Sequence, residues 1–354
     1  MNKIERVNNV MNQKNCSQLL ICDPFAIFYL TGNLIEPGER LYVMYINSTD
    51  NTQKLFVNKL FDMKNIPNVE VVYYSDDDDP VSILSGTIKN ETVLIDKNFP
   101  AKFLLPLIKS TNANYLVSDI LEYVRLVKTE DEINLMRESS RLNDEAMSLL
   151  VKNIKANQTE LELLEILKSI KKELELDAFS FDPIIAFGKN AAEPHHVPND
   201  TKLKEGDCIV IDMGFIKDNY CSDMTRTFFY KYASDFDKKI YDIVLHANQK
   251  AINEVKPDAK FSQIDLAARN FIEDNGYAKN FIHRTGHSIG IECHEFGAVS
   301  QDNYDLLKPG MIFSIEPGIY LIDKLGVRIE DLVLVTENGY EILNKYPKDL
   351  QVIN

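Results

Sequence analysis

Four carboxylates interrupt runs of apolar residues that otherwise have the pattern of buried β-strands. Asp212 and Asp223 lie in CIVIDMGFIKDNYCSDMTRTF, and Glu316 and Glu330 lie in SIEPGIYLIDKLGVRIEDLVLV. An isolated acid on a strand usually faces solvent, but chance rarely places four of them within apolar strands beside a cluster of histidines. Buried like charges require either raised pKa values or a counter-cation.

The two aspartates belong to a stretch that predicts a β-hairpin. With Lys217 and Asp218 as a two-residue turn, Asp212 falls directly opposite Asp223, and residues so paired have Cβ atoms about 5 Å apart. Like charges at that separation destabilise a sheet. Lys-Asp-Asn is not an ideal hairpin turn, which leaves this register open. The prediction is two aspartates that face each other on β structure.

The two glutamates are predicted to meet in a second hairpin. This stretch folds back around Asp323 to Gly326, which brings Glu316 and Glu330 toward one another at the ends of apolar strands. Four carboxylates balance the charge of two divalent cations, and with one imidazole they form a ligand set that suits Mn²⁺, Co²⁺ or Fe²⁺. Two-metal sites activate water as a nucleophile at neutral pH.

A candidate imidazole ligand lies in HRTGHSIGIECHE, which holds three of the six histidines of the chain. Gly286 and Gly290 flank His287, which favours close backbone approach over the interior of a helix. The pattern therefore differs from the H-E-x-x-H helix of zinc proteases. His283 and His294 complete the cluster. Any one of the three could be structural, but together, between glycines and beside the strand-like IGIEC, they indicate a site.

The remaining histidines lie in other contexts. His195 and His196, in EPHHVPND, belong to a loop because prolines flank them. His246 lies in the helical stretch YDIVLHANQK, where the simplest interpretation is a packing or surface residue.

Composition disfavours several classes of protein. The formal net charge of −15 argues against nonspecific binding to nucleic acid or anionic lipid, which require clustered Lys and Arg. Five scattered cysteines without a C-x-x-C pair argue against a disulfide framework or a thiolate zinc site and indicate a reducing compartment. The N-terminus lacks an apolar signal region, and the best apolar run, Leu19 to Leu30, is too short to span a bilayer. We expect a cytoplasmic protein.

The first part of the chain, residues 1 to 124, has an α/β pattern. Apolar β-rich runs alternate with helix-like stretches, so at least some strands should pair in parallel. The runs are Leu19 to Cys22, Leu41 to Ile46, Val69 to Tyr74 and Thr92 to Asp96. With 354 residues, the chain is long enough for two domains that each bury a core.

The second part, residues 125 to 354, has an α+β pattern. Capping-box signals mark the helix starts, and hairpin-connected strands lie between and after the helices. One helix is expected from Thr129 to about Ile154, and another opens at Thr159 to Glu162. Further starts are expected at Ser234 to Asp237 and at Ser262 to Asp265.

Seven short motifs follow one another along the chain in this order: EPHHVP, IDMG, SDMTRT, HRTGHSIG, CHE, SIEPGIY and GVRIED. They resemble the pita-bread metallopeptidases, the family of methionine aminopeptidase, aminopeptidase P and prolidase, over essentially the whole chain. Residues 1 to 124, with DPFAIFYLTGN, resemble a creatinase-type N-terminal domain, and residues 125 to 354 resemble the pita-bread catalytic domain. The resemblance implies hydrolysis of Xaa-Pro bonds in proline-containing di- or oligopeptides. Relatives are commonly homodimers, which implies one here.

The resemblance assigns five metal ligands. Asp212 would bind one ion, Asp223 and Glu330 would bridge both, and His287 and Glu316 would complete the second site. Mn²⁺ is the expected ion, with Co²⁺, Fe²⁺ or Zn²⁺ as alternatives, because such ligand sets accept several metals.

The resemblance also assigns residues around the substrate. His195, His283 and His294 match histidines that contact substrate and stabilise the developing charge. Arg328 would orient a metal-binding carboxylate from the same strand face as Glu330 and would contribute to substrate binding. Glu316 would carry the proton to the leaving nitrogen.

Two positions depart from the family pattern. Ser288 replaces the usual glycine after the ligand histidine, a small change that fits but can narrow the pocket. Ala298 stands where prolidases that cut dipeptides often carry an arginine for the free carboxylate. Cleavage of the first residue from longer Xaa-Pro peptides therefore competes with strict dipeptidase activity. A non-catalytic binding protein is a further alternative, which ligand-type residues at all five positions disfavour. His283 and the additional N-terminal domain disfavour methionine aminopeptidase.

Overall fold

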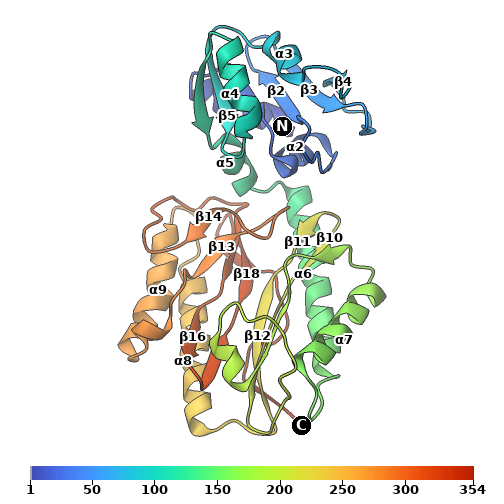
Figure 1. Ribbon diagram of the computed structural model, residues 1–354. Coiled ribbons are helices and arrows are strands. Elements are labelled where there is room, and N and C mark those ends of the chain that lie inside the picture. The colour runs from blue at the N-terminus through green and yellow to red at the C-terminus, as the bar shows by residue number, and fades with distance from the viewer. Residues whose placement is uncertain (1) are drawn as a thin grey trace. The chain divides into compact units, whose positions relative to one another are not determined.

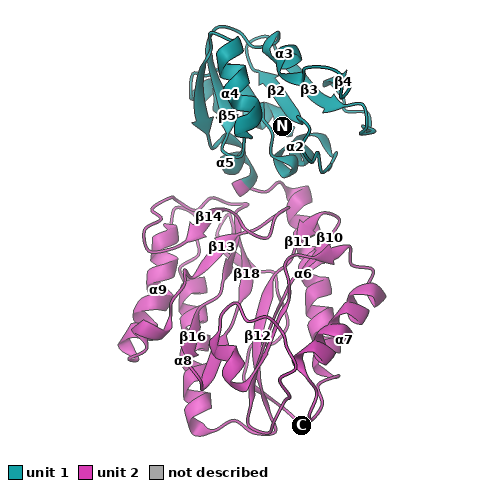
Figure 2. Ribbon diagram, viewed as in Figure 1, with its two compact units in different colours: residues 1–125 teal, residues 126–354 magenta. Residues whose placement is uncertain are grey.

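The computed structural model describes residues 2–354. The chain divides into two compact units, Met1–Arg125 and Leu126–Asn354 (Figure 1, Figure 2). No helix among residues 2–354 has both the length and the apolar character needed to cross a bilayer.

The first unit is built on a mixed sheet with the strand order β4-β3-β2-β1-β5-β6. β1 pairs in parallel with β5 and β5 with β6, so the expected α/β pattern with parallel pairing is confirmed. Leu20, Val43, Phe56 and Val93 lie in its buried core. The strands are β1 (Gln18–Ile21), β2 (Val43–Asn47), β3 (Thr52–Asn58), β4 (Glu70–Tyr74), β5 (Thr92–Asp96) and β6 (Asn114–Ser118). The helices are α1 (Lys3–Gln13), α2 (Pro24–Thr31), α3 (Pro80–Ser85), α4 (Ala101–Ser110) and α5 (Ile120–Leu126).

The second unit has the expected α+β organisation, with sheets between helices that are antiparallel apart from one parallel pair at a sheet edge. One sheet has the order β20-β12-β9-β8 and another the order β14-β13-β15-β18-β19, while β16-β17 and β11-β10-β7 form smaller sheets. The strands are β7 (Ala178–Phe179), β8 (Ile184–Phe187), β9 (Cys208–Met213), β10 (Phe215–Lys217), β11 (Tyr220–Cys221), β12 (Met224–Tyr230), β13 (Gly286–Ser288), β14 (Glu295–Val299), β15 (Ile312–Ile315), β16 (Gly318–Leu321), β17 (Leu325–Arg328), β18 (Asp331–Thr336), β19 (Gly339–Ile342) and β20 (Gln351–Ile353). The helices are α6 (Glu130–Val151), α7 (Glu160–Glu173), α8 (Asp235–Asn253) and α9 (Phe261–Asp274), with 3₁₀ turns η1 (Gly188–Ala192) and η2 (Ala278–Asn280).

Three of the four expected helix starts in this unit are confirmed. Capping boxes at Thr129, Thr159 and Ser234 open α6, α7 and α8. The start expected at Ser262 is wrong, because α9 begins at Phe261 with Lys260 at its N-cap. The Asp265 carboxylate is used elsewhere: it pairs with Arg269 and accepts hydrogen bonds from the backbone and hydroxyl of Thr285. Asp265 therefore makes a tertiary contact and does not cap the helix, although its spacing from Ser262 is that of a capping box.

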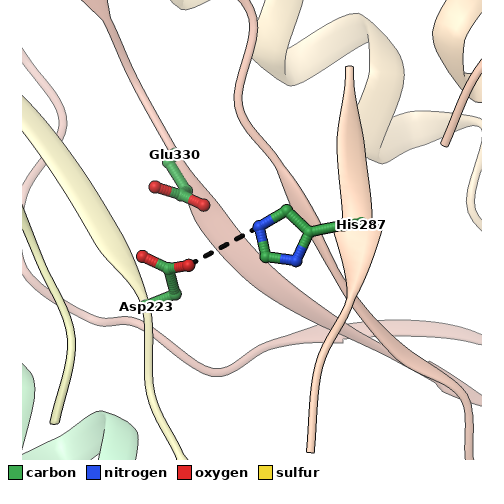
Figure 3. A group of neighbouring side chains, drawn as sticks. All are labelled: Asp223, His287 and Glu330. Carbon is green, nitrogen blue, oxygen red and sulfur yellow. Dashed lines mark ion pairs between the residues drawn. The ribbon is translucent and has the colours of Figure 1, made fainter. Parts of the chain in front are cut away.

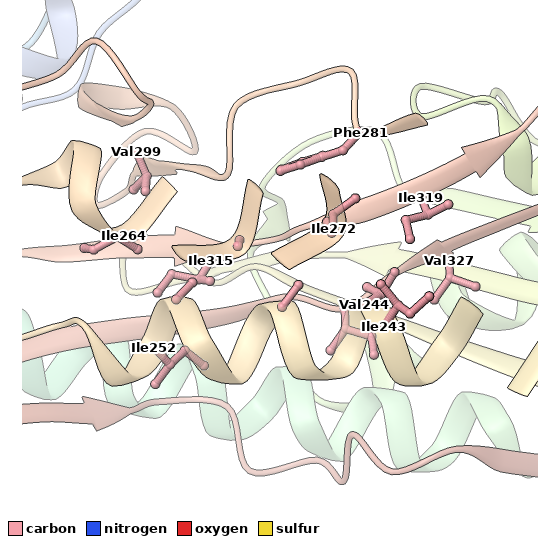
Figure 4. Close-up of a cluster of buried hydrophobic side chains, with 14 of the residues drawn as sticks. Ile243, Val244, Ile252, Ile264, Ile272, Phe281, Val299, Ile315, Ile319 and Val327 are labelled. Atoms are coloured by element: carbon pink, nitrogen blue, oxygen red, sulfur yellow. The ribbon is translucent and has the colours of Figure 1, made fainter. Parts of the chain in front are cut away.

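Two apolar clusters hold the helices against the sheets. α6 and α7 share a core with β8, β9 and β12. α8 and α9 share another with β15, β17 and β18, where Ile243, Val244 and Ile272 pack near Ile315 and Val327 (Figure 4). The sheets are therefore covered by helices, and the acids within them have little access to water except through a cavity.

Candidate metal centre

The hairpin that carries the two aspartates has a register different from the predicted one. Asp212 on β9 lies opposite Thr225 on β12, so the prediction that it directly faces Asp223 is wrong. The turn is formed by Asp218 and Asn219, which have φ values of 50° and 66°. Asp and Asn tolerate the left-handed conformation that a two-residue hairpin turn requires, so the turn lies one residue later than expected. The pairing then shifts by two residues, which preserves the face of each side chain.

The hairpin that carries the two glutamates turns at residues 322–324, slightly earlier than the expected turn around Asp323 to Gly326, because Leu321 pairs with Leu325. Gly318 pairs with Arg328 on β16 and β17, and Ile315 pairs with Asp331 on β15 and β18. Glu316 and Glu330 lie at matching positions between these two ladders, so the structure confirms that the hairpin brings them together.

Ligand atoms from three distant segments form the tightest group. Those of Asp223, His287 and Glu330 all lie within 4.8 Å of one another and are buried (Figure 3). Glu316 joins the group through a 3.4 Å contact between its Oε1 and His287 Nε2. Asp212 lies beside this group and lines the same cavity. The structure therefore brings together all five residues that the resemblance assigned as ligands.

The imidazole of His287 is oriented as a metal ligand requires. Its Nδ1 lies 3.3 Å from the carbonyl oxygen of Ser288, which places the ring proton on Nδ1. Burial and the neighbouring His294 lower the pKa of His287 to about 3, so the ring is neutral. Its Nε2 lone pair then faces Asp223 Oδ2 at 3.6 Å, the contact drawn as a dashed line in Figure 3. A lone pair directed at a carboxylate is unfavourable unless a cation lies between them.

Two carboxylate oxygens at the centre are buried without a donor. Among residues 2–354, Asp212 Oδ1 and Asp223 Oδ1 have no hydrogen-bond partner. Burial, followed by the neighbouring carboxylates, raises the pKa of both Asp223 and Glu330 well above the ordinary value. Burial also raises the pKa of Glu316 to about 7. Unsatisfied buried carboxylate oxygens in a cluster of like charge are costly. These residues therefore fit divalent cations.

Arg328 links the centre to three surrounding segments. Its Nη2 donates to Asp212 Oδ2 at 2.7 Å, and its Nε donates to Thr225 Oγ1 at 3.1 Å. Its Nη1 donates to Tyr320 Oη at 2.9 Å and to the Pro194 carbonyl at 3.3 Å. Four of the five N–H groups of the guanidinium donate to protein atoms, so its geometry favours positioning of Asp212 over direct contact with a substrate.

His283 is also engaged at both ring nitrogens. Its Nδ1 donates to the carbonyl of Arg284 at 2.7 Å, and its Nε2 accepts from the hydroxyl of Tyr320 at 2.9 Å. The Tyr320 oxygen already accepts from Arg328, which directs its own proton to His283. Burial and the Arg328 charge lower the pKa of His283 to about 4. In this arrangement His283 retains no donor for a substrate.

His195 and His294 differ from His283 in this respect. Both are exposed, both line the cavity, and neither ring has a hydrogen-bond partner among the described residues. The His294 ring lies 4.1 Å from that of His287, centroid to centroid. The cavity has a volume of about 790 Å³. These two histidines are therefore the ones free to contact a substrate.

Close packing of the backbone sets the position of His287. A Cβ atom on Gly286 would lie 1.9 Å from the Ser314 carbonyl oxygen, so only glycine allows β13 to approach β15 this closely. Ser288 does not narrow the pocket, because its hydroxyl donates to the Gly297 carbonyl at 2.9 Å and the residue does not line the cavity. Ala298 pairs with His287 from the adjacent strand β14.

Three residues that support the acids or the surrounding site residues were not predicted from sequence. The hydroxyl of Thr225 donates to Glu330 at 2.8 Å, and that of Ser314 donates to Glu316 at 3.2 Å. Tyr320 joins Arg328 to His283. Strand alternation offered a signal, since Ser314 precedes Glu316 by two residues on one strand face. Thr225 carried no signal of its own, because it acts across a separation of 105 residues.

Comparison with known proteins agrees with this architecture. Residues 134–337 match the model of metallopeptidase family M24, and residues 3–127 match the creatinase/prolidase N-terminal domain. A protein of Staphylococcus aureus, named as an uncharacterised peptidase, is 37% identical to this chain. The alignment covers 98% of this chain and 100% of the Staphylococcus aureus protein. The solved Xaa-Pro dipeptidase of Bacillus anthracis is 27% identical with a TM-score of 0.90, covering 99% of each chain. The solved X-Pro aminopeptidase of Thermotoga maritima is 28% identical with a TM-score of 0.87, covering 100% of each chain.

Carboxylates carried on β-strands and a neutral imidazole, gathered at one cavity, define a metal-dependent hydrolase. The chain belongs to metallopeptidase family M24 and carries a creatinase/prolidase-type N-terminal domain. The pita-bread catalytic fold expected from the sequence motifs is thereby confirmed, and family membership implies divalent metal ions.

Proposed function

We propose that this chain hydrolyses Xaa-Pro peptide bonds with two divalent ions. The preferred assignment is an Xaa-Pro dipeptidase of prolidase type. The two ions would be held by Asp212, Asp223, His287, Glu316 and Glu330. The observation that carries the proposal is the pair of buried oxygens without donors, Asp212 Oδ1 and Asp223 Oδ1, beside a neutral imidazole. A binding protein without metal would leave both of these atoms unsatisfied.

The surroundings of the five ligands suit amide hydrolysis. When bound, the ions would lower the pKa of water and polarise the scissile carbonyl. Glu316 borders both the cavity and His287, so it can hold the proton that passes to the leaving nitrogen. His294 and His195 can donate hydrogen bonds to the substrate carbonyl as charge develops on its oxygen. Arg328 holds Asp212 in place, and His283 acts through Tyr320.

The cavity wall suits the proline ring. Apolar side chains line one part of it, including Phe179, Phe181, Pro183, Ile184 and Val197. The nitrogen of an Xaa-Pro bond has no N–H, so the enzyme must recognise ring shape and apolar surface. Solved proteins similar to this chain include one named as an Xaa-Pro dipeptidase and one named as an X-Pro aminopeptidase, which supports proline as the common element.

The positively charged side chains that line the cavity favour a dipeptide substrate. Arg328 is engaged by Asp212, and Lys168 pairs with Glu165 at 2.6 Å. Arg284 also lines the cavity, but within residues 2–354 its guanidinium has neither an ion pair nor a hydrogen bond. The free carboxylate of an Xaa-Pro dipeptide would supply that partner. Removal of the first residue from longer peptides is the alternative, because Ala298 cannot supply a second positively charged side chain to bind the free carboxylate of a dipeptide.

We further infer that Mn²⁺ is the preferred ion and that the protein acts as a cytoplasmic homodimer. The oxygen-rich ligand set supports Mn²⁺. All five cysteines are buried as free thiols, which is consistent with a reducing compartment. The dimer rests on the likeness to relatives, and light scattering coupled to gel filtration tests it.

The proposal is tested by incubating the Mn²⁺-loaded protein with Ala-Pro, Met-Pro and Ala-Pro-Ala and identifying the products by mass spectrometry. A dipeptidase releases free proline from the first two and leaves the tripeptide intact. An aminopeptidase releases alanine and Pro-Ala from the tripeptide. Absence of cleavage of all three by metal-loaded protein would contradict the proposal.

A further inference from the structure

A buried carboxylate outside the metal centre holds the loop that carries His195. Glu160 lies in the first turn of α7 and has no exposed surface. Its Oε1 accepts hydrogen bonds from the Phe187 backbone amide at 2.8 Å and from Asn190 Nδ2 at 2.9 Å. Its Oε2 accepts from His196 Nε2 at 2.7 Å and from the Asn199 backbone amide at 2.9 Å. All four donors belong to the segment 187–199.

The end of this segment and the residues that follow it, up to residue 201, also dock on the start of α7 through the backbone. The amides of Glu160 and Leu161 donate to the carbonyls of Thr201 and Asn199 at 3.2 and 3.3 Å. The amides of the first helical turn have no partner within the helix, so these carbonyls satisfy them. The loop and the helix terminus therefore form one hydrogen-bonded unit centred on the Glu160 carboxylate.

His195 is fixed by its neighbours in this unit and not by bonds of its own. On one side, the Pro194 carbonyl accepts from Arg328, the residue that also holds Asp212. On the other side, His196 is buried and bonded to Glu160. The ring of His195 has no hydrogen-bond partner in the described part of the chain and lines the cavity. Its position relative to Asp212 thus depends on both anchors.

We propose that Glu160, acting through His196 and Asn199, is a positioning residue that holds the imidazole of His195 at the catalytic cavity. This inference rests on the proposed function, because the role of His195 toward substrate belongs to it. Glu160 itself contacts neither the cavity nor the five proposed metal ligands. The anchor adds a function to the second histidine of the EPHHVP motif, which holds the loop so that the first can meet the substrate.

Glutamine at position 160 is a sharp probe of this arrangement. Each carboxylate oxygen accepts one backbone N–H, from Phe187 or from Asn199, and a backbone N–H cannot reverse its direction. In Glu160→Gln the side-chain amide must therefore present an N–H to one of them, whichever way it turns. The variant retains the size of the side chain but breaks the anchor on one side.

The experiment is a double-mutant cycle on hydrolysis of Ala-Pro with Glu160→Gln, His195→Ala and both changes together. Glu160→Gln is expected to lower kcat/KM roughly 10- to 100-fold, with metal stoichiometry unchanged. In the His195→Ala background the same change is expected to cost about twofold or less, because the residue on which Glu160 acts is absent. Glu162→Gln, in the same helical turn but exposed, is the matched control and should retain wild-type kcat/KM. Equal losses in both backgrounds would overturn the proposal, as would wild-type activity of Glu160→Gln.

Hydrogen exchange supplies a second readout that is independent of catalysis. Glu160→Gln should accelerate amide exchange in the segment 187–199 at least tenfold relative to Glu162→Gln, whereas unchanged protection would refute the anchor. If the wild-type protein cleaves no Xaa-Pro peptide, the proposed function fails while this measurement still judges the anchor. Should Glu160→Gln not fold, His196→Phe removes one of the four bonds, and the same cycle and exchange measurement apply to it.

Discussion

Arg328 donates a 2.7 Å hydrogen bond from Nη2 to Asp212 Oδ2, and both side chains are buried. The other nitrogens of the same guanidinium reach Thr225, Tyr320 and the Pro194 carbonyl. One planar group thus fixes a proposed metal ligand, the partner of His283 and the loop of His195. The geometry depends on the fork of the guanidinium as well as on its charge.

Arg328→Lys should therefore weaken metal binding although it keeps the positive charge. A lysine ammonium can pair with Asp212 but cannot also span Thr225 and Tyr320. We expect a loss of roughly 10- to 100-fold in Mn²⁺ affinity, measured by titration calorimetry. Lys324→Ala, in the exposed turn of the neighbouring hairpin, is the control and should bind as wild type. Wild-type affinity in Arg328→Lys would show that only the charge matters.

Stability of the metal-free protein should fall as pH rises through neutrality. The pKa of Glu316 is raised to about 7, chiefly by burial. A carboxyl group with a higher pKa in the folded chain binds protons more readily when folded. Its contribution to stability is then complete below the unfolded value and is lost as pH rises through the folded one. The contribution is on the order of 3 kcal/mol for such a shift.

The corresponding measurement is thermal unfolding with and without Mn²⁺ at about pH 6 and about pH 8. The rise in Tm caused by Mn²⁺ should be larger at the higher pH, because the cation replaces the lost protons. In Glu316→Gln, which cannot titrate at this position, the metal-free protein should lose less stability between the two pH values than wild type does. A metal-free wild-type protein that is equally stable at both pH values would contradict the raised pKa of Glu316 in the folded chain.

Arg284→Gln should reduce activity selectively on substrates with a free carboxylate. If the guanidinium binds that group, KM for Ala-Pro should rise roughly 10-fold or more, since charge-assisted hydrogen bonds are among the strong ones. Ala-Pro amide should be cleaved by variant and wild type with similar KM. Lys168→Gln, at another cation of the cavity, is the control. An equal rise of KM for both substrates would remove Arg284 from carboxylate recognition.

Gly286→Ala should destabilise the catalytic unit. The added Cβ would meet the Ser314 carbonyl oxygen at 1.9 Å and would force β13 away from β15, which separates His287 from Glu316. The free energy of unfolding should fall by about 3 kcal/mol. Gly86→Ala meets only the Ile83 carbonyl at 3.6 Å and should stay within about 0.5 kcal/mol of wild type in urea denaturation. Similar midpoints for both variants would show that β13 can yield without cost.

Sequence patterns predicted those features that depend on neighbours along the chain. The capping boxes of α6, α7 and α8 and the convergence of Glu316 and Glu330 follow from short-range signals, and the structure confirms them. β3 and β6 were missed, because TQKLFVN begins with polar residues and the apolar run of NYLVS is bounded by polar Asn114 and Ser118. The register of Asp212 was wrong because the identity of the turn residues, and not the apolar pattern, decided it.

Features that depend on long-range contacts were beyond the reach of sequence patterns. Glu160 looked like an ordinary residue of a helix start, yet its four donors lie 27 to 39 residues further along the chain. Asp265 had the spacing of a cap but bonds Thr285 in a different element. The engagement of both nitrogens of His283 depends on Tyr320, which the motif contained without indicating its partner. Such partners are chosen by tertiary packing.

The proposed metal centre holds two divalent ions between five ligands, Asp212, Asp223, His287, Glu316 and Glu330. It is tested most directly by the metal content of protein equilibrated with Mn²⁺ and freed of unbound ion, measured by inductively coupled plasma mass spectrometry. We predict about two ions per wild-type chain and a clear loss in Asp223→Asn, since two-metal sites share bridging ligands. A wild-type chain that retains no stoichiometric metal, or an Asp223→Asn variant that retains the full amount, would contradict the account.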